Sequence, residues 1–207
     1  MKTILIILVI MVIWSIWGYF GSKVEQSDYT VIEKKKDYEI RNYGAHIVAE
    51  TTISGSTYRD ALNLGFSIIA GYIFGGNTKK EKIAMTAPVI EKIGSSEKIS
   101  MTAPVIVNIE GDTHIISFGM PRSYSMDILP TPNDSRVKLR EVPAQKIAVL
   151  RFSWSRSGDR VQYMKNKLLD YLSRDKIETM GSPCYAGYNA PWTPPWMVRN
   201  EILIEIK

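Results

Sequence analysis

The side chains that most often coordinate metals or catalyse reactions are few in this sequence and lie far apart. Cys184 is the sole cysteine, which excludes a disulfide within the chain, a cysteine-rich metal site and the C-x-x-C-H motif of covalent haem attachment. The two histidines, His46 and His114, form no zinc-binding motif, and no G-x-S-x-G sequence supports a Ser-His-Asp triad. No motif pairs two carboxylates for acid–base catalysis. We therefore expect a binding protein and not an enzyme.

The composition is that of an ordinary globular protein. The chain has 207 residues, of which 45% are hydrophobic and 23% are charged, so a disordered or collagen-like chain is excluded. The 26 basic and 21 acidic residues are too nearly balanced to predict a nucleic-acid partner. Residues 24–207 contain no linker rich in Pro, Gly or Ser, which predicts one compact domain of undetermined oligomeric state.

An apolar segment precedes this domain. Residues 3–20 are uncharged, and at about 1.5 Å per residue a helix of this length reaches roughly 27 Å, enough to cross a hydrocarbon core. A cleaved signal peptide is the alternative, but the segment ends in large aromatic residues and not in a small-x-small cleavage site. Aromatic residues are typical of the membrane interface. We predict that residues 1–23 form an uncleaved membrane anchor and that residues 24–207 form the functional domain.

The basic residues around this segment predict its orientation. Lys2 and the amino terminus favour an N-terminus inside the cell, which places the domain on the extracytoplasmic (periplasmic or outer) face of the membrane. Lys23 and residues 34–36 carry positive charge on the other side of the segment and favour the opposite orientation. A short positive N-terminus is the stronger signal, so we expect the outer face.

The rest of the sequence must fold into elements that position a binding site. Apolar residues spaced as on one face of a helix follow possible N-caps at Ser56 and Ser157, which predicts two amphipathic helices. Stretches of alternating apolar residues predict strands, the first two of them joined as a hairpin. The predicted strands cover residues 29–33, 38–43, 46–53, 114–120, 137–142, 146–154 and 201–206.

These elements recur in the same order. Aligning Ile47-Val48-Ala49 with Ile147-Ala148-Val149 gives an offset of 100 residues, with which the two helices also coincide. This predicts an α+β domain with a pseudo-two-fold axis, a curved sheet carrying two helices and a cleft at the seam between the halves. A shorter repeat relates residues 81–89 to residues 97–105, and the turn-like residues between them predict that the two copies face each other in a hairpin.

Four motifs, in this order, resemble the SOUL haem-binding family, and the resemblance extends from about Tyr29 to the C-terminus. They are Tyr38-Glu39-Ile40-Arg41-x-Tyr43, Lys-Ile-x-Met-Thr-Ala-Pro-Val, Phe118-Gly119-Met120-Pro121, and Ala186-Gly187-Tyr188-Asn189-x-Pro191 with Arg199-Asn200-Glu201. The resemblance implies a distorted antiparallel β-barrel flanked by two main helices and built from two similar halves. It also implies non-covalent binding of haem or another tetrapyrrole, without established catalysis.

The resemblance implies a tetrapyrrole slot formed by the first helix and a neighbouring loop. The matching residues are Leu62, Phe66, Ile69, Ala70 and Ile73, with Tyr72 at the margin. The alternative for most of these residues is packing on the sheet, because an apolar helical stripe is usually core. Some family members place a histidine where this chain has Asn42. His46 and His114 are weak axial candidates, both expected to be solvent-exposed, and Met85, Met101 and Trp192 are further candidate contacts.

Three functions remain open at this point. The first is a membrane-anchored tetrapyrrole-binding protein that acts as carrier, buffer or sensor. The second is a protein that binds other planar apolar molecules, because the two-half architecture resembles GyrI-like small-molecule-binding domains and the aromatic loop of residues 192–196 could clamp any flat compound. The third is an interaction module at the membrane that docks through this same aromatic loop.

Overall fold

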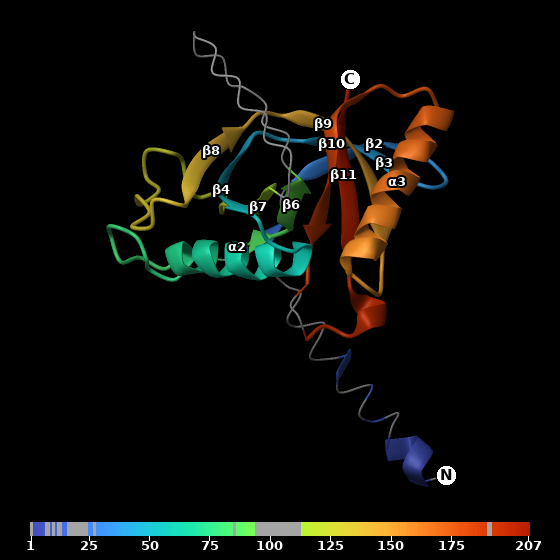
Figure 1. Cartoon of the computed structure of the whole chain (residues 1–207), viewed down its shortest axis with the longest axis horizontal. Coiled ribbons are helices and arrows are strands. Elements are labelled where there is room, and N and C mark those ends of the chain that lie inside the picture. Colours follow the sequence, from blue (N-terminus) through green and yellow to red (C-terminus); the bar gives the residue numbers. More distant parts are fainter. Residues whose placement is uncertain are drawn as a thin grey trace.

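The computed structural model has an α+β fold in which a curled antiparallel sheet, a half-barrel, carries two long helices on one face (Figure 1). It describes residues 2–6, 9, 11, 14–15, 25–26, 28–84, 86–93, 113–189 and 192–207. The helices are α2 (Tyr58–Ile73) and α3 (Gly158–Arg174), with a 3-10 turn η1 (Pro195–Met197). The strands of the main sheet are β2 (Tyr29–Lys34), β3 (Glu39–Tyr43), β4 (His46–Ser54), β6 (Val89–Ile93), β7 (Thr113–Gly119), β8 (Lys138–Val142), β9 (Gln145–Phe152), β10 (Thr179–Gly187) and β11 (Asn200–Ile206).

The order of the strands shows that the two halves are interlocked. From one edge to the other the sheet runs β2-β3-β9-β11-β10-β6-β7-β4-β8. Each half has the chain order strand, strand, helix, strand, strand: β3, β4, α2, β6 and β7 in the first, and β8, β9, α3, β10 and β11 in the second. Strand β3 of the first half pairs with β9 of the second, and β8 of the second pairs with β4 of the first. Neither half is therefore complete without the other.

Each helix begins at a hydroxyl cap and lies over its own half. The side chain of Thr57 accepts a hydrogen bond from the backbone N–H of Asp60, and that of Ser157 accepts one from Arg160. The first cap therefore lies one residue after the predicted Ser56. Helix α2 packs on β4 and β7, and α3 packs on β9, β10 and β11. The N-terminal ends of the helices meet, because Gly158 lies against the ring of Tyr58 (Figure 1).

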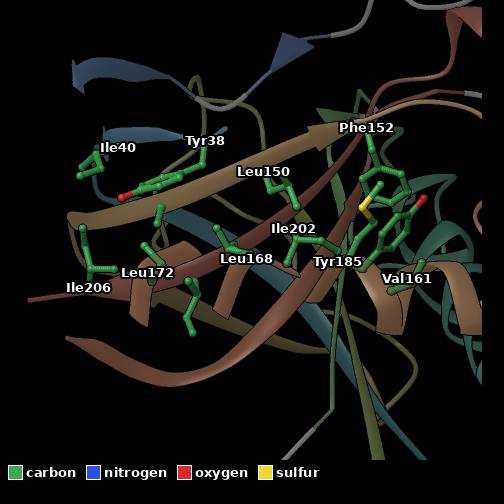
Figure 2. Close-up of a cluster of buried hydrophobic side chains, with 13 residues drawn as sticks. Tyr38, Ile40, Leu150, Phe152, Val161, Leu168, Leu172, Tyr185, Ile202 and Ile206 are labelled. Carbon is green, nitrogen blue, oxygen red and sulfur yellow. The ribbon is translucent and has the colours of Figure 1, made fainter. Parts of the chain in front are cut away.

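Three apolar clusters form the core. One lies between α3 and the sheet, where Leu168 and Leu172 pack on Ile202 and their neighbours (Figure 2). The second lies under α2 and includes Ile69 and Phe118. The third occupies the face of the sheet opposite both helices. Its buried members are Tyr43, Ala87, Ile147, Val149, Ala186, Tyr188 and Leu203.

Most predicted elements are confirmed, but the sequence analysis missed one strand, and the offset between the two halves needs a correction. Strand β10 was not predicted, because its pairing is irregular between Met180 and Cys184 and the apolar alternation is interrupted there. The offset of 100 residues holds for the helices but not for the strands. Ala49 faces α2, and its counterpart under α3 is Ala148, an offset of 99. The caps Thr57 and Ser157 are 100 residues apart, so the spacing from the alanine to the helix cap is one residue shorter in the first half. Successive strand residues face opposite ways, so a shift of one residue exchanges the two faces.

Two predictions fall largely outside the described residues. Within residues 3–20 the structure describes only residues 3–6, 9, 11, 14 and 15. Among the described residues, no helix combines the length and the apolar character needed to cross a membrane. Residues 97–105, the second copy of the short repeat, also lie outside the described part. The first copy contributes β5 (Thr86–Ala87), which pairs in parallel with β1 (Glu25–Gln26).

Candidate functional site

One side of α2 carries an apolar stripe, which we call the α2 stripe and define as Leu62, Phe66, Ala70 and Phe74. These residues recur every four positions and so follow one side of the helix and its C-cap. Phe66 is 40% exposed and Phe74 is 59% exposed, whereas Leu62 is half-buried and Ala70 is buried. The ring of Phe66 lies 5.4 Å from that of Phe118 on β7, which fixes its position. The α2 stripe thus offers apolar surface to a guest.

The equivalent side of α3 has the opposite chemistry. With the helix offset of 100 residues the counterparts of the α2 stripe are Gln162, Asn166, Asp170 and Arg174, and all four are exposed. The Gln162 side-chain amide donates a 3.0 Å hydrogen bond to the Asn166 side chain. A helix on this sheet therefore does not need an apolar residue at these positions. The exposed aromatic residues of α2 have no structural counterpart, which marks them as a candidate binding surface.

Basic side chains flank both ends of the α2 stripe. Arg59 is exposed in the first turn of α2, and Lys79, Lys80 and Lys82 are exposed after its C-terminus. The ammonium group of Lys79 donates a 3.1 Å hydrogen bond to the Ile128 carbonyl. Next to the stripe, a Cβ atom added at Gly71 would meet no heavy atom within 4 Å, so this part of the helix surface is open. An apolar surface between cations matches a flat ring with carboxylate substituents.

The remaining residues of the predicted slot lie in the core beneath the helix. Ile69, Tyr72 and Ile73 are at most 1% exposed and pack on the sheet. The Tyr72 hydroxyl donates a 2.9 Å hydrogen bond to the Pro130 carbonyl. Burial is the main cause that raises the pKa of Tyr72 to about 12. These side chains support the helix from below, and a guest on the outer surface would contact Leu62, Phe66 and Ala70 of the predicted set.

The candidate axial ligands are dispersed. His46 is half-buried at the start of β4, with Nδ1 2.9 Å from the Gly44 carbonyl oxygen, and Asn42 is exposed on β3. Trp192 is 61% exposed in the loop before β11. Met85 and Met101 lie outside the described residues. Within the part that is described, no three His, Cys, Asp or Glu side chains are grouped to hold a metal ion.

His114 corrects a prediction, because it is buried and paired instead of exposed. Its Nδ1 lies 3.0 Å from a carboxylate oxygen of Glu91, and the other oxygen accepts a hydrogen bond from the Lys165 ammonium at 3.3 Å. All three side chains are at most 7% exposed, in the seam between the helices. The position of His114 at a strand end favours exposure, but the ring of Tyr58, the first residue of α2, lies edge-on to the His114 ring at 6.4 Å. The pairing of Glu91 with Lys165 joins residues 74 positions apart, and no local pattern signals it.

Two further polar groups lie in this seam without a hydrogen-bond partner. They are the Tyr58 hydroxyl and the side-chain N–H₂ group of Asn200. The side-chain oxygen Oδ1 of Asn200 accepts a 2.8 Å hydrogen bond from the Tyr185 hydroxyl. Burial raises the pKa of Tyr58 and raises that of Tyr185 to about 12. The polar groups described in this seam are thus buried, whereas the sequence predicted a cleft there.

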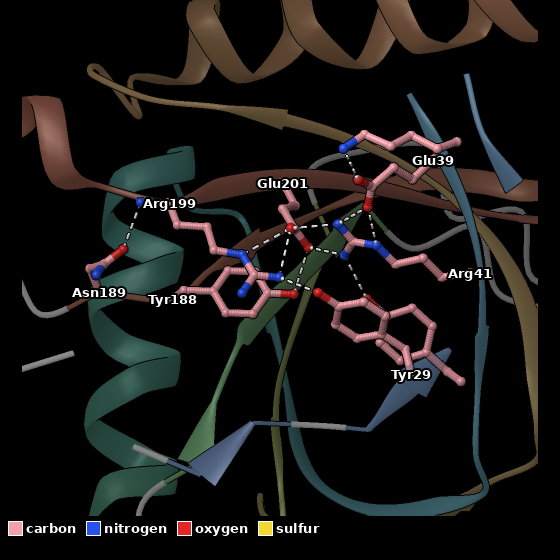
Figure 3. Close-up of polar contacts among 9 residues, drawn as sticks. Tyr29, Glu39, Arg41, Tyr188, Asn189, Arg199 and Glu201 are labelled. Atoms are coloured by element: carbon pink, nitrogen blue, oxygen red, sulfur yellow. Dashed lines mark hydrogen bonds and ion pairs between the residues drawn. The ribbon is translucent and has the colours of Figure 1, made fainter. Parts of the chain in front are cut away.

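A second buried network lies on the other face of the sheet and is centred on Glu201 (Figure 3). Glu201 is fully buried and accepts hydrogen bonds from Arg41 at 2.9 and 3.2 Å, from Arg199 at 2.9 Å and from the Tyr188 hydroxyl at 2.6 Å. Burial opposes the charge of Arg41, but the hydrogen bonds to Glu201 outweigh it and raise the pKa of the guanidinium. The Asn189 side chain accepts a 2.6 Å bond from the Arg199 backbone N–H.

This network explains two of the four sequence motifs, the first and the last. The first motif provides Glu39, Arg41 and Tyr43. The last motif provides Tyr188 and Asn189, together with Arg199 and Glu201 from its second part. They meet because β3, β9 and β11 are neighbours in the sheet. Their side chains satisfy one another's charges in a buried site. We conclude that these motif residues hold the fold together, whereas the candidate binding surface lies on α2, on the opposite face.

Comparisons with known proteins agree with this architecture. Heme-binding protein 2 of Mus musculus is 28% identical over 181 residues, covering 82% of each chain, and Heme-binding protein 2 of Homo sapiens is 30% identical over 155 residues, covering 74% of this chain and 71% of the human protein. The EcmrR C-terminal domain shares the fold with a TM-score of 0.60 at 11% identity, covering 86% of this chain and 98% of that domain. A hydrolase from Listeria innocua gives a TM-score of 0.51 at 9% identity, covering 85% and 94%. The model of the SOUL heme-binding protein family matches residues 24–205, and the chain belongs to this family.

Proposed function

We propose that this protein binds haem or a related tetrapyrrole non-covalently on the α2 stripe, without catalysing a reaction. The observation that carries the proposal is the contrast between Phe66 and Phe74, exposed on α2, and the polar residues at the equivalent positions of α3. The family description and the names of the two mammalian relatives support a haem ligand. Haem supplies a planar apolar macrocycle with two carboxylates at one edge.

The residues present fit such a guest. The macrocycle would lie on Phe66, Leu62 and Phe74, where aromatic and aliphatic carbon excludes water from one of its faces. Arg59 or the lysines after α2 would pair with the propionates at the edge, in solvent-exposed ion pairs of modest strength. In the described part of the chain this surface includes no histidine, so the apolar contact supplies most of the affinity. Binding of this kind suits a carrier or buffer that must also release its ligand.

A titration of the detergent-solubilised full chain with hemin tests this proposal. We expect a saturable Soret change, and we expect Phe66→Asn and Phe74→Ser each to raise the Kd about fivefold to tenfold, because a half-buried aromatic contact of about 1 kcal/mol is lost. The matched control is Asn166→Ala on α3, which should leave the Kd unchanged. Phe74 is the safer position, since it is exposed and outside the core.

The alternatives predict different results in the same titration. Equal Kd values for all variants would refute the α2 stripe as the site. Equal affinities for hemin and for unrelated planar apolar dyes would favour the general binding of flat compounds over tetrapyrrole binding. A Soret change that His46→Ala abolishes would show that iron coordination by His46, and not the stripe, provides the affinity.

We also propose that residues 3–20 anchor the domain to a membrane, with the domain on the extracytoplasmic face. The support is the uncharged apolar sequence and Lys2 before it. The test is extraction of native membranes with alkaline carbonate, in which the full chain should stay in the pellet. Protease added to intact cells or spheroplasts should then degrade the domain. Release by carbonate would refute the anchor, and protection from protease would refute the orientation.

A further inference from the structure

Tryptophans from three distant parts of the sequence gather at one end of the molecule. The indole N–H of Trp14 donates a 2.8 Å hydrogen bond to the Trp192 carbonyl, and the Trp14 ring meets the Trp196 ring edge-on at 5.4 Å. The backbone N–H of Trp154 donates a 3.1 Å bond to the Pro195 carbonyl. Figure 1 shows the N-terminal residues projecting from the end of the molecule at which η1 lies. Trp14 is 41%, Trp154 63%, Trp192 61% and Trp196 36% exposed.

The loop that carries two of these tryptophans suits a medium of low polarity. Residues 192–198 contain no charged side chain, and Pro194 and Pro195 have no backbone N–H to leave unsatisfied. The 3-10 turn satisfies a further donor, because the Met197 N–H bonds to the Pro194 carbonyl at 2.9 Å. Transfer of this loop from water into lipid would therefore cost little desolvation and would bury two indole rings.

The contact with Trp14 indicates how deep the loop would lie. Trp14 precedes the end of the apolar segment of residues 3–20 by six positions, which is about 9 Å along a helix. If residues 3–20 form the proposed anchor helix, a loop that touches Trp14 would lie below the boundary of the hydrocarbon layer. Trp154 is further along the surface, and the exposed residues Arg151, Arg156 and Arg160 surround it in the sequence with Asp159 as the nearby acid. Such a basic rim matches anionic headgroups.

We infer that residues 192–198 insert into the lipid bilayer beside the anchor, with Trp154 at the headgroup level, so that the domain contacts the membrane through this aromatic end. The inference rests on the proposed anchor. Insertion also fixes the orientation of the domain, because α3 begins at Gly158, shortly after Trp154, and the N-terminal end of α2 meets that of α3. The α2 stripe would then begin close to the membrane surface, where an apolar ligand dissolved in lipid could reach it.

The experiment uses the full chain in vesicles of phosphatidylcholine and phosphatidylglycerol that contain brominated lipid. In two single-tryptophan variants, every tryptophan except Trp154 or except Trp192 is replaced by Phe. In the control all five are replaced by Phe and Tyr163→Trp adds a probe on the outer surface of α3, where Tyr163 is 55% exposed. We expect brominated lipid to quench Trp192 strongly and Trp154 partly, and aqueous acrylamide to quench the control at least threefold more than Trp192.

Acrylamide quenching of Trp154 and Trp192 equal to that of the control, in protein that sediments with the vesicles, would overturn the insertion and leave the anchor intact. Protein that stays in the supernatant would overturn both, while the hemin titration would still report on the α2 stripe. If the variants with four replacements do not fold, W192F in the otherwise native chain serves instead. It should remove a larger share of the bromolipid-quenched emission than W154F, and equal or absent losses would overturn the inference.

Discussion

Helices α2 and α3 occupy equivalent places in the two halves, yet they differ at two sides of the helix. On the outer side, Phe66 and Phe74 of α2 correspond to Asn166 and Arg174 of α3. On the inner side, Gly65 of α2 corresponds to Lys165 of α3. Gly65 lets α2 approach the side chain of Ile116, whereas Lys165 reaches into the seam to Glu91.

This difference separates stability from function within one repeated scaffold. The inner residues of both helices contribute to the core. Gly65 of α2 allows close packing, and Lys165 of α3 forms a buried ion pair. The outer residues of α3 are polar, as expected of a solvated helix, and those of α2 are not. A helix that served only the fold would resemble α3, which is why we propose that the first half carries the binding surface.

The largest expected effect concerns the network that joins the halves. Glu201→Gln removes the buried charge that faces Arg41 of the first half and Arg199 of the second, although Arg41 keeps its ion pair with Glu39. We expect a loss of about 3–5 kcal/mol in the free energy of unfolding, measured by urea denaturation. Glu205→Gln, on the same strand but half-buried, is the control and should change it by about 0.5 kcal/mol or less. Similar losses for both would show that the network does not hold the halves together.

The ion pair under α3 should be the next most sensitive feature. Lys165→Met keeps the volume of the side chain but leaves Glu91 with His114 as its partner, so we expect a loss of about 2–4 kcal/mol in the free energy of unfolding. Lys167→Met, two residues on and half-buried, should have little effect. An increase in stability for Lys165→Met would mean that desolvating the buried pair costs more free energy than its electrostatic attraction provides. It would also show that α3 tolerates an apolar residue on its inner side, as α2 does.

Close packing of α2 can be tested with two glycines of the same helix. A Cβ atom at Gly65 would lie 2.7–2.9 Å from side-chain atoms of the fully buried Ile116, so Gly65→Ala should cost about 1–3 kcal/mol. A Cβ atom at Gly71 would meet no heavy atom within 4 Å beyond its own helix backbone, so Gly71→Ala should stabilise the helix by about 0.5–1 kcal/mol. Thermal unfolding of both variants measures the difference. Equal changes in melting temperature would contradict the close approach.

The smallest effect distinguishes the C-terminal ends of the helices at low pH. Asp175 caps α3, and hydrogen bonds from Arg174 and then from the Tyr38 hydroxyl, at 2.7 Å, hold its pKa below the ordinary value of 3.8, whereas the equivalent residue after α2 is Gly75. A lowered carboxylate pKa contributes stability above the unfolded value that is lost as the pH falls through the folded value. Tyr38→Phe should therefore raise the pKa of Asp175 towards 3.8 in an NMR titration. An unchanged pKa would show that the Tyr38 bond is unimportant.

Several features of this protein could be predicted from local sequence. The two helices, the cap at Ser157 and seven of the strands follow from periodicity and hydroxyl residues within a few positions. The first cap is Thr57 and not the predicted Ser56. These hydroxyl residues are adjacent, and only the geometry shows which of them accepts the hydrogen bond from the Asp60 backbone N–H. The place of Phe66 and Leu62 on the binding surface stays a prediction, and their presence on one side of α2 follows from their spacing alone.

The sequence by itself determined the elements, their repetition and the family, because each depends on residues close together in the chain or on an ordered set of motifs. The tertiary structure decided which side chains meet. Arg41 and Glu201 are 160 positions apart, and Glu91 and Lys165 are 74 apart. These contacts depend on strand order and register, and on which face of a strand a helix covers. A shift of one residue in a strand reverses its faces, so no local pattern could have shown that His114 is buried or that the motif residues support the fold from the face opposite α2.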